Sequence, residues 1–150
     1  WTVFPLVPRY KTAANAGVMI LEVAMNLEHG ISTISLCDNV ISVKIDGSFN
    51  LEGIISYHKK LTSIIESLQL IKFKMLIDFL DAEGATPDAL EENNKFNIWL
   101  EDKNLVAKAV VIDSAALLNV FISRVPAQKS QNIQSFDNKA SGYKWLKLQS

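Results

Sequence analysis

The sequence has little of what disulfides, zinc sites or membrane spans require. Cys37 is its one cysteine, which excludes an internal disulfide, and only His29 and His58 join it as soft ligands for zinc. A lone thiol suits a reducing, cytoplasmic setting. The longest apolar stretches, such as residues 106–112, fall well short of the roughly 20 residues of a membrane-spanning helix. We therefore expect a soluble protein without a bound metal or cofactor.

A strong charge of either sign is also missing. Fifteen lysines and arginines against sixteen aspartates and glutamates give a formal net charge of -1. No broad positive field is present to attract nucleic acid phosphates, so we expect no nucleic acid partner. A chain of 150 residues has the size of one domain and can bury one sizeable core.

The first 24 residues differ from the rest of the chain. Trp1 is not a normal initiator, whereas Met25 is a possible start of translation. Arg9 and Lys11 precede a short apolar stretch, which leaves a signal peptide as an alternative, although Glu22 interrupts that stretch. We expect residues 1–24 to be a non-native or poorly ordered extension and residues 25–150 to form a single domain.

Two short apolar runs, residues 73–79 and 105–112, indicate the fold class. The segment between them is too long for a hairpin and has the pattern of a helix, so we expect the two strands to lie side by side and parallel. Parallel strands need helices on both faces of their sheet. Residues 105–112 are apolar on both alternating sets apart from Lys108, which is typical of an interior strand.

The elements before this pair follow from shorter patterns. Residues 31–36 and 40–45 are rich in β-branched side chains and are separated by the turn-like residues 37–39. This pattern predicts a hairpin whose first strand is antiparallel and lies at the edge of the sheet. Residues 51–68 carry an apolar stripe with helical spacing, and Asn50 is the expected N-cap of that helix.

The later elements are marked mainly by capping residues. Thr86 is expected to cap the crossover helix, and the pair Asp113-Ser114 a short third helix. A polar loop at 124–132 returns the chain to a short strand near 133–136, and Asp137 is expected to cap the last helix. The expected order is β-β-α-β-α-β-α-β-α, which describes an α/β domain with a mixed, mostly parallel sheet of about five strands.

Four segments of the chain share a pattern with a known family. They are Met-Leu-Ile-Asp-Phe at 75–79, Gly-Ala-Thr-Pro-Asp-Ala-Leu at 84–90, Asn-Leu-Val-Ala-Lys-Ala-Val-Val-Ile-Asp-Ser at 104–114 and Trp-Leu at 145–146. With the order of elements, they resemble the SpoIIAA-like family of small bacterial proteins, which share the fold of the STAS domain (sulfate transporter and anti-sigma factor antagonist). The resemblance spans residues 31–148 and implies a non-enzymatic binding or regulatory module with a protein partner or a small ligand.

The resemblance also directs attention to one turn. Anti-sigma factor antagonists carry an Asp-Ser-Ser-Gly-like turn before the helix after the third strand, and a partner kinase phosphorylates the second serine. The corresponding residues 81–87 read Asp-Ala-Glu-Gly-Ala-Thr-Pro and contain no serine. Thr86 is the one hydroxyl in this turn, and a threonine before a proline at a helix start is typical of an N-cap.

The residues at the carboxyl ends of the expected strands form the first candidate site. Ligands of open α/β sheets usually bind in the crevice at that edge. A carboxylate cluster there could hold Mg²⁺; in the alternative interpretation Asp46-Gly47 is a turn, Asp113 an N-cap and Asp78 a strand-end residue that meets backbone amides. The expected contact edge comprises residues 47–50, 81–88 and 113–116, with the candidate residues Asp46, Asp78, Asp81, Glu83, Thr86, Asp113 and Ser114.

The second candidate site is for an apolar ligand. The SpoIIAA-like family is also compared with CRAL-TRIO lipid carriers, which implies a carrier of an apolar or lipid ligand or a peripheral membrane protein. The third helix and the 124–132 loop would then form a lid with Phe121, Arg124, Val125 and Pro126. A basic edge near the opening, made of scattered lysines, would support only weak contact with anionic lipid; these are Lys139, Lys144 and Lys147.

No residue pattern indicates catalysis. His58 lies near the apolar stripe of the first helix and has no local nucleophile or carboxylate, so a half-buried structural role is expected. Cys37 lies in a turn with nothing nearby that lowers its pKa, and an inert thiol is expected. Asn93 falls on the buried side of its helix, where it could line a pocket or satisfy a neighbouring loop. We expect a protein that is not an enzyme.

Overall fold

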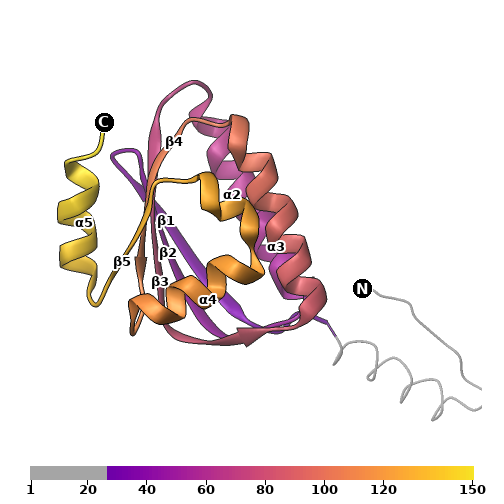
Figure 1. The fold of residues 1–150 in the computed structure, drawn as a ribbon. Coiled ribbons are helices and arrows are strands. Elements are labelled where there is room, and N and C mark those ends of the chain that lie inside the picture. The colour runs from indigo at the N-terminus through magenta and orange to yellow at the C-terminus, as the bar shows by residue number, and fades with distance from the viewer. Residues whose placement is uncertain (1–26) are drawn as a thin grey trace, which may run out of the picture.

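A five-stranded sheet runs through the computed structural model, which describes residues 27–150 (Figure 1). The strands lie in chain order: β1 (Ile31–Cys37), β2 (Val40–Phe49), β3 (Phe73–Ala85), β4 (Leu105–Val111) and β5 (Ile133–Phe136). β1 pairs antiparallel with β2, and the other three pairs are parallel. The expected mixed, mostly parallel sheet is confirmed, as is the parallel pair β3 and β4. The expectations for residues 1–24 and for Met25 lie outside the described residues.

Helices cover both faces of the sheet, as parallel strands require. α2 (Leu51–Leu68) and α3 (Pro87–Trp99) lie on one face, and α5 (Lys139–Lys147) lies on the other (Figure 1). α4 (Ala115–Arg124) and the short 3-10 helix η2 (Pro126–Ser130) contact α3 and complete the first face. A further 3-10 turn, η1 (Leu100–Asp102), ends α3. In residues 27–150 no helix is both long enough and apolar enough to cross a bilayer.

Local signals of the sequence fix most element boundaries. Asp38 and Asn39 take positive φ angles of 52° and 64°, the conformation of a two-residue type I′ hairpin turn. Asn50 and Thr86 cap α2 and α3, as expected, by accepting hydrogen bonds from Gly53 N and Ala89 N. The cap of α4 falls within the expected pair Asp113-Ser114, and the cap of α5 lies one residue from the expected Asp137.

The cap of α4 confirms the expected pair but not the alternative in which Asp113 is the N-cap, and the cap of α5 corrects the sequence-based assignment. Ser114, and not its neighbour Asp113, accepts the hydrogen bond from the first turn of α4. Asn138 caps α5, so the expected cap at Asp137 is wrong. In both cases two adjacent residues have side chains suited to capping, and the second of them, in extended conformation, accepts the hydrogen bond.

β2 and β3 are longer than their sequences predict. They continue to Phe49 and Ala85, past the expected ends at 45 and 79. Two register shifts along this pair give β3 two extra residues: Phe79 and Leu80 lie opposite Ile45, and Glu83 has no partner on β2. The alternative assignment of Asp46-Gly47 to a turn is therefore wrong. The region 80–85 was not predicted as strand because aspartate, glutamate, alanine and glycine are depleted in strands.

The buried side chains form two clusters that the sheet separates. The larger cluster joins the β2 and β3 side chains of one face with the apolar stripes of α2 and α3, including Leu61, Phe73 and Met75. The smaller one joins Ala109 and other β4 residues to Leu146 of α5. Because side chains alternate along a strand, β4 contributes Ala107, Ala109 and Val111 to the α5 face and directs Lys108 to the other face.

Candidate functional site

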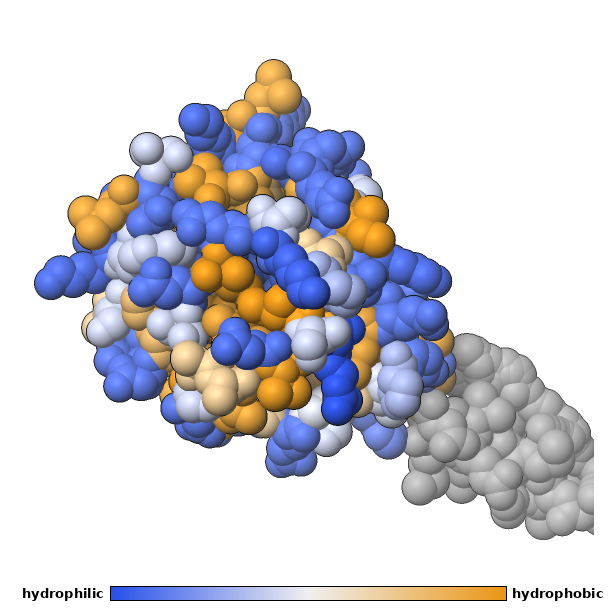
Figure 2. All heavy atoms as spheres, viewed as in Figure 1, coloured by the Kyte–Doolittle hydropathy of each residue, from blue (hydrophilic) through white to orange (hydrophobic). Residues whose placement is uncertain are grey.

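A cavity of about 490 Å³ lies between the sheet and the helices α2, α3 and α4. Its walls come from β2, β3 and β4, from α2, α3 and α4, and from η2. Figure 2, in the view of Figure 1, shows apolar side chains gathered near the centre of the face on which α4 lies, with polar side chains around them. The volume falls in the range of roughly 300–1,000 Å³ that is usual for small-molecule sites.

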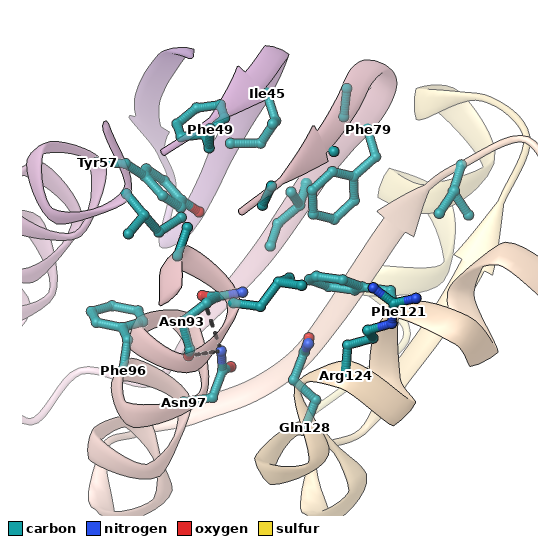
Figure 3. A pocket seen from close by; sticks show the side chains of 18 of the residues that line it. Ile45, Phe49, Tyr57, Phe79, Asn93, Phe96, Asn97, Phe121, Arg124 and Gln128 are labelled. Atoms are coloured by element: carbon teal, nitrogen blue, oxygen red, sulfur yellow. Dashed lines mark hydrogen bonds between the residues drawn. The ribbon is translucent and has the colours of Figure 1, made fainter. Parts of the chain in front are cut away.

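Most of the cavity wall is aromatic or aliphatic. Side chains of β2 and β3 form one side, and Tyr57 of α2 points its hydroxyl toward the open space (Figure 3). Phe121 of α4 meets Phe79 of β3 edge to face, with ring centroids 5.1 Å apart, and so links α4 to the sheet. The apolar lining includes Ile45, Phe49, Leu61, Met75, Ile77, Phe79, Phe96, Leu117, Val120 and Phe121.

The remaining wall is a connected polar group. Lys108 Nζ donates to Asn97 Oδ1 at 3.1 Å and to Gln128 Oε1 at 3.3 Å. Asn97 Nδ2 in turn donates to the backbone oxygen of Asn93 at 2.8 Å, and Asn93 Oδ1 lies 3.0 Å from His58 Nε2. Asn93, Asn97 and Gln128 converge on one side of the cavity from α3 and η2 (Figure 3). The expectation that Asn93 could line a pocket is confirmed.

Burial changes the acid–base behaviour of three groups in or beside the cavity. Desolvation lowers the pKa of Lys108 from 10.5 to about 7. It also lowers the pKa of His58 from 6.5 to about 4, against the opposing effect of the hydrogen bond to Asn93. Burial raises the pKa of Tyr57. His58 is buried rather than half-buried and stacks on Phe96, with ring centroids 4.1 Å apart, which explains its desolvation.

The outer part of the cavity carries exposed charges. Glu83 and Asp113 line it from the ends of β3 and β4, and Arg124 lines it from the last turn of α4. Leu117 and Val120 of α4 are about half exposed there, at 48% and 53%. α4 therefore presents apolar side chains both to the cavity and to the surface beside it.

The structure puts the residues of the expected contact edge in three different locations. Glu83 and Asp113 line the cavity. Thr86 and Ser114 act as N-caps of α3 and α4 at the same end of the sheet. Asp46, Asp78 and Asp81 lie on the strands β2 and β3 and do not line the cavity.

Asp78 belongs to the α5 face of the sheet. It is 4% exposed, accepts a hydrogen bond from Leu80 N at 3.0 Å, and lies 3.9 Å from Lys139 Nζ of α5. Asp81 forms an ion pair with Lys44, the register partner of Asp78, so both carboxylates face α5. Residues 27–150 contain no group of three or more His, Cys, Asp or Glu placed to hold a metal ion. The carboxylates of the expected edge therefore do not converge as a Mg²⁺ site would require.

The residues of the expected lid are also divided. Phe121 and Arg124 line the cavity, whereas Val125 is fully buried between α4 and η2. Pro126 lines a smaller hollow beside it. The lysines Lys139, Lys144 and Lys147 lie on α5, across the sheet from the cavity, so the expectation of a basic edge near the apolar opening is wrong.

Four cavity residues were not predicted as functional: Tyr57, Lys108, Asn97 and Gln128. The sequence could have indicated Lys108, because it is the one charged residue in an otherwise apolar interior strand. Asn97 lies one helical turn after Asn93 on α3 and could have been found by that spacing. Gln128 lies on η2, within the segment expected to be a polar loop, and lines the cavity. Nothing in the sequence around it indicates a functional residue.

Two solved structures have folds similar to that of this chain. A protein of the DUF3478 family with a SpoIIAA-like fold, from Shewanella loihica PV-4, is similar with a TM-score of 0.62 and 18% identity, over 81% of this chain and 96% of that one. An anti-sigma factor antagonist from Mycobacterium paratuberculosis is similar with a TM-score of 0.56 and 12% identity, over 79% and 95% of the two chains. No family model and no curated protein matches the chain. The chain has a SpoIIAA-like fold, which confirms the resemblance at the level of architecture.

Proposed function

We propose that this domain is a non-enzymatic binding module that holds one small, mainly apolar molecule in the cavity between the sheet and α4. The observation that carries the proposal is the cavity of about 490 Å³ with a mostly aromatic and aliphatic wall. Protein interiors are otherwise packed about as densely as organic crystals, so an apolar space of this size is suited to a ligand. Binding would bury additional apolar surface and is favourable for that reason.

α4 is the element best placed to admit the ligand. It is a short helix of 10 residues, and only Leu118 in it is buried. The contact between Phe121 and Phe79 closes the space beneath it, while Val125, which is 0% exposed, fixes its far end. Rotation of α4 about this fixed end would open the cavity without disturbing the sheet. Phe121 and Arg124 thus keep the lid role that the sequence suggested, and Val125 acts as its anchor.

The proposal is tested with the neutral apolar dye N-phenyl-1-naphthylamine, whose fluorescence rises in apolar surroundings. We expect saturable binding of one dye molecule per chain and displacement by 1-decanol. Native mass spectrometry of protein purified without detergent should show a bound molecule of lipid-like mass. Leu70→Ser removes an apolar side chain that is 90% exposed in the turn after α2 and should leave dye binding unchanged. Absence of saturable binding would show that the cavity takes no apolar ligand.

A second candidate function is protein binding at the loop edge of the sheet. The anti-sigma factor antagonist fold supports it, as does the position of two helix N-termini, those of α3 and α4, at that edge. Exposed amide groups and helix dipoles would orient the partner there. The test is a pull-down from native cytoplasm with the unaltered chain and with Thr86→Ala. Loss of a captured protein with Thr86→Ala, without loss of folding, would favour this function and a role for the Thr86 hydroxyl.

A further inference from the structure

At the inner end of the cavity, Lys108 has a hydrogen-bond donor without a partner. Lys108 is 3% exposed, and its ammonium group can donate three hydrogen bonds, of which Asn97 Oδ1 and Gln128 Oε1 accept two. Among residues 27–150, no carboxylate lies within 4 Å of its nitrogen. A buried ammonium group without a counter-charge is costly, and burial accordingly lowers the pKa of Lys108.

Gln128 supplies a second donor without a partner. The residue is 1% exposed, its amide end points into the cavity in Figure 3, and its Nε2 has no hydrogen-bond partner. Buried amide nitrogens are nearly always paired in folded proteins, and an unpaired one calls for a specific explanation. Gln128 Oε1 already accepts from Lys108, so the same side chain holds the lysine and presents a free donor beside it.

The side-chain acceptors of the cavity wall beside these donors are already engaged. Gln131 Oε1 and His58 Nδ1 are also buried without hydrogen-bond partners, but neither residue lines the cavity. Asn97 Oδ1 accepts from both Lys108 Nζ and Gln131 Nε2, the latter at 2.9 Å. Asn93 Oδ1 faces His58 Nε2. The free donors of Lys108 and Gln128 are therefore available to a group that enters through the cavity.

We propose that Lys108 and Gln128 bind the carboxylate of an amphiphilic ligand, such as a medium-chain acid, whose hydrocarbon chain lies along the aromatic wall. This inference rests on the proposed function and specifies its ligand class. One ammonium group matches one negative charge, and hydrogen bonds in which both partners are charged are the stronger kind. The carboxylate would stabilise the protonated form of Lys108.

The charges at the outer part of the cavity favour the same orientation. Glu83 and Asp113 both line that part, where they would repel a carboxylate, and Arg124 is the one cation among its described lining residues apart from the buried Lys108. A head group at the inner end avoids this repulsion and leaves the hydrocarbon chain toward α4. Lys108 and Gln128 then set the ligand class, and the apolar wall supplies most of the contact area.

The experiment compares three ligands of equal chain length that differ in their head groups. Decanoate, 1-decanol and decylamine are titrated at pH 7 against protein loaded with N-phenyl-1-naphthylamine. We expect decanoate to displace the dye at a concentration at least about tenfold lower than decanol, the difference that one charge-assisted hydrogen bond supplies. Decylamine should be the weakest. Equal displacement by decanoate and decanol, or a preference for decylamine, would overturn the carboxylate assignment while leaving the apolar cavity site intact.

Two variants distinguish binding of the carboxylate at Lys108 and Gln128 from an effect of the protein's overall charge. Lys108→Met keeps the length of the side chain and should remove the preference for decanoate without weakening decanol. Gln128→Glu places a carboxylate next to Lys108 and should likewise abolish the preference. Lys129→Met is the control, because it removes the same charge from an exposed position on η2. A decanoate preference that survives in Gln128→Glu would overturn the proposal, and failure of every form to bind the dye would overturn the proposed function itself.

Discussion

The two faces of the sheet are closed in different ways. On the α5 face the helix approaches so closely that Gly142 lies directly against the strands: a Cβ there would be 3.1 Å from Leu76 Cδ1 and 3.4 Å from Ala109 Cβ. On the other face, α2 and α3 carry large apolar side chains but leave a cavity of about 490 Å³ beneath α4. One strand, β4, serves both faces, with Ala109 on the first and Lys108 on the second.

The difference places the tightly packed face and the proposed binding site on opposite sides of one sheet. Small residues allow close backbone approach and leave no room for a ligand on the α5 face. On the cavity face Lys108 is buried in the cavity wall, where a ligand can reach it, and His58 is buried beside the cavity against Phe96. The two faces should therefore respond differently to pH and to added side-chain volume, and four predictions follow from that contrast in order of decreasing effect on stability.

The largest effect is expected from Lys108 at alkaline pH. The unfolded chain keeps this proton up to a pKa of 10.5, whereas the folded chain releases it near 7. Between these values the unfolded state binds more protons, so the free energy of unfolding should rise with pH by up to about 1.4 kcal/mol per unit. Urea unfolding at pH 7.5 and 8.5, where tyrosines with an ordinary pKa of about 10 stay protonated, measures this rise.

Lys108→Met should remove the alkaline rise, and Lys129→Met should keep it. Lys108→Met should also be more stable than the unaltered chain at pH 7.5, because an apolar side chain of similar length replaces a buried amine. Equal slopes in all three proteins would show that the amine of Lys108 is hydrated in the folded state.

The second effect concerns His58 at acidic pH. Its pKa is lowered from 6.5 to about 4, so the unfolded state binds more protons between these values and stability should fall as the pH falls through them. The loss attributable to this residue is about 3 kcal/mol at most over the window. Because carboxylates titrate in the same range, the measurement is the difference in unfolding free energy between the unaltered chain and His58→Phe at pH 4.5 and 6.5. A difference that does not change with pH would contradict the assignment.

Most of the fold could be predicted because it depends on local patterns. The hairpin turn at Asp38-Asn39 and the caps Asn50 and Thr86 are specified by residues adjacent in sequence. The extension of β3 could not be predicted, because its residues 80–85 have low strand propensity and are held by pairing along β2. Tertiary context overrides local preference there.

The candidate site was less predictable for the same reason. The two register shifts in β3 decide that Asp81 faces α5 whereas Glu83 lines the cavity, although both were assigned to one edge. The cavity depends on how far α4 and η2 lie from the sheet, and no residue pattern records that distance. Lys108 was visible as an exception in an apolar strand, but the oxygens that accept its hydrogen bonds come from α3 and η2, which are distant in sequence.

The third prediction adds volume to the closed face. Gly142→Leu places a side chain where even a Cβ would lie 3.6 Å or less from Leu76, Ala109 and Phe136. Overpacking of this kind costs about 1–3 kcal/mol, so the urea midpoint should fall clearly. Ala140→Leu adds a leucine to the exposed side of α5 and should leave the midpoint nearly unchanged. A tolerated leucine at position 142 would mean that α5 is not held tightly on the sheet.

The fourth prediction adds volume to the open face, where the effect on stability should be smallest. Ala82 lies on β3 and lines the cavity, so Ala82→Leu can place its extra carbons in empty space and should shift stability by only about 0.5 kcal/mol. The same leucine should reduce the affinity for N-phenyl-1-naphthylamine at least about tenfold, because it occupies volume that the dye needs. Ala140→Leu is again the control and should bind the dye normally. A large loss of stability with unchanged dye binding would show that the space near Ala82 is already filled and that the contrast between the faces does not hold.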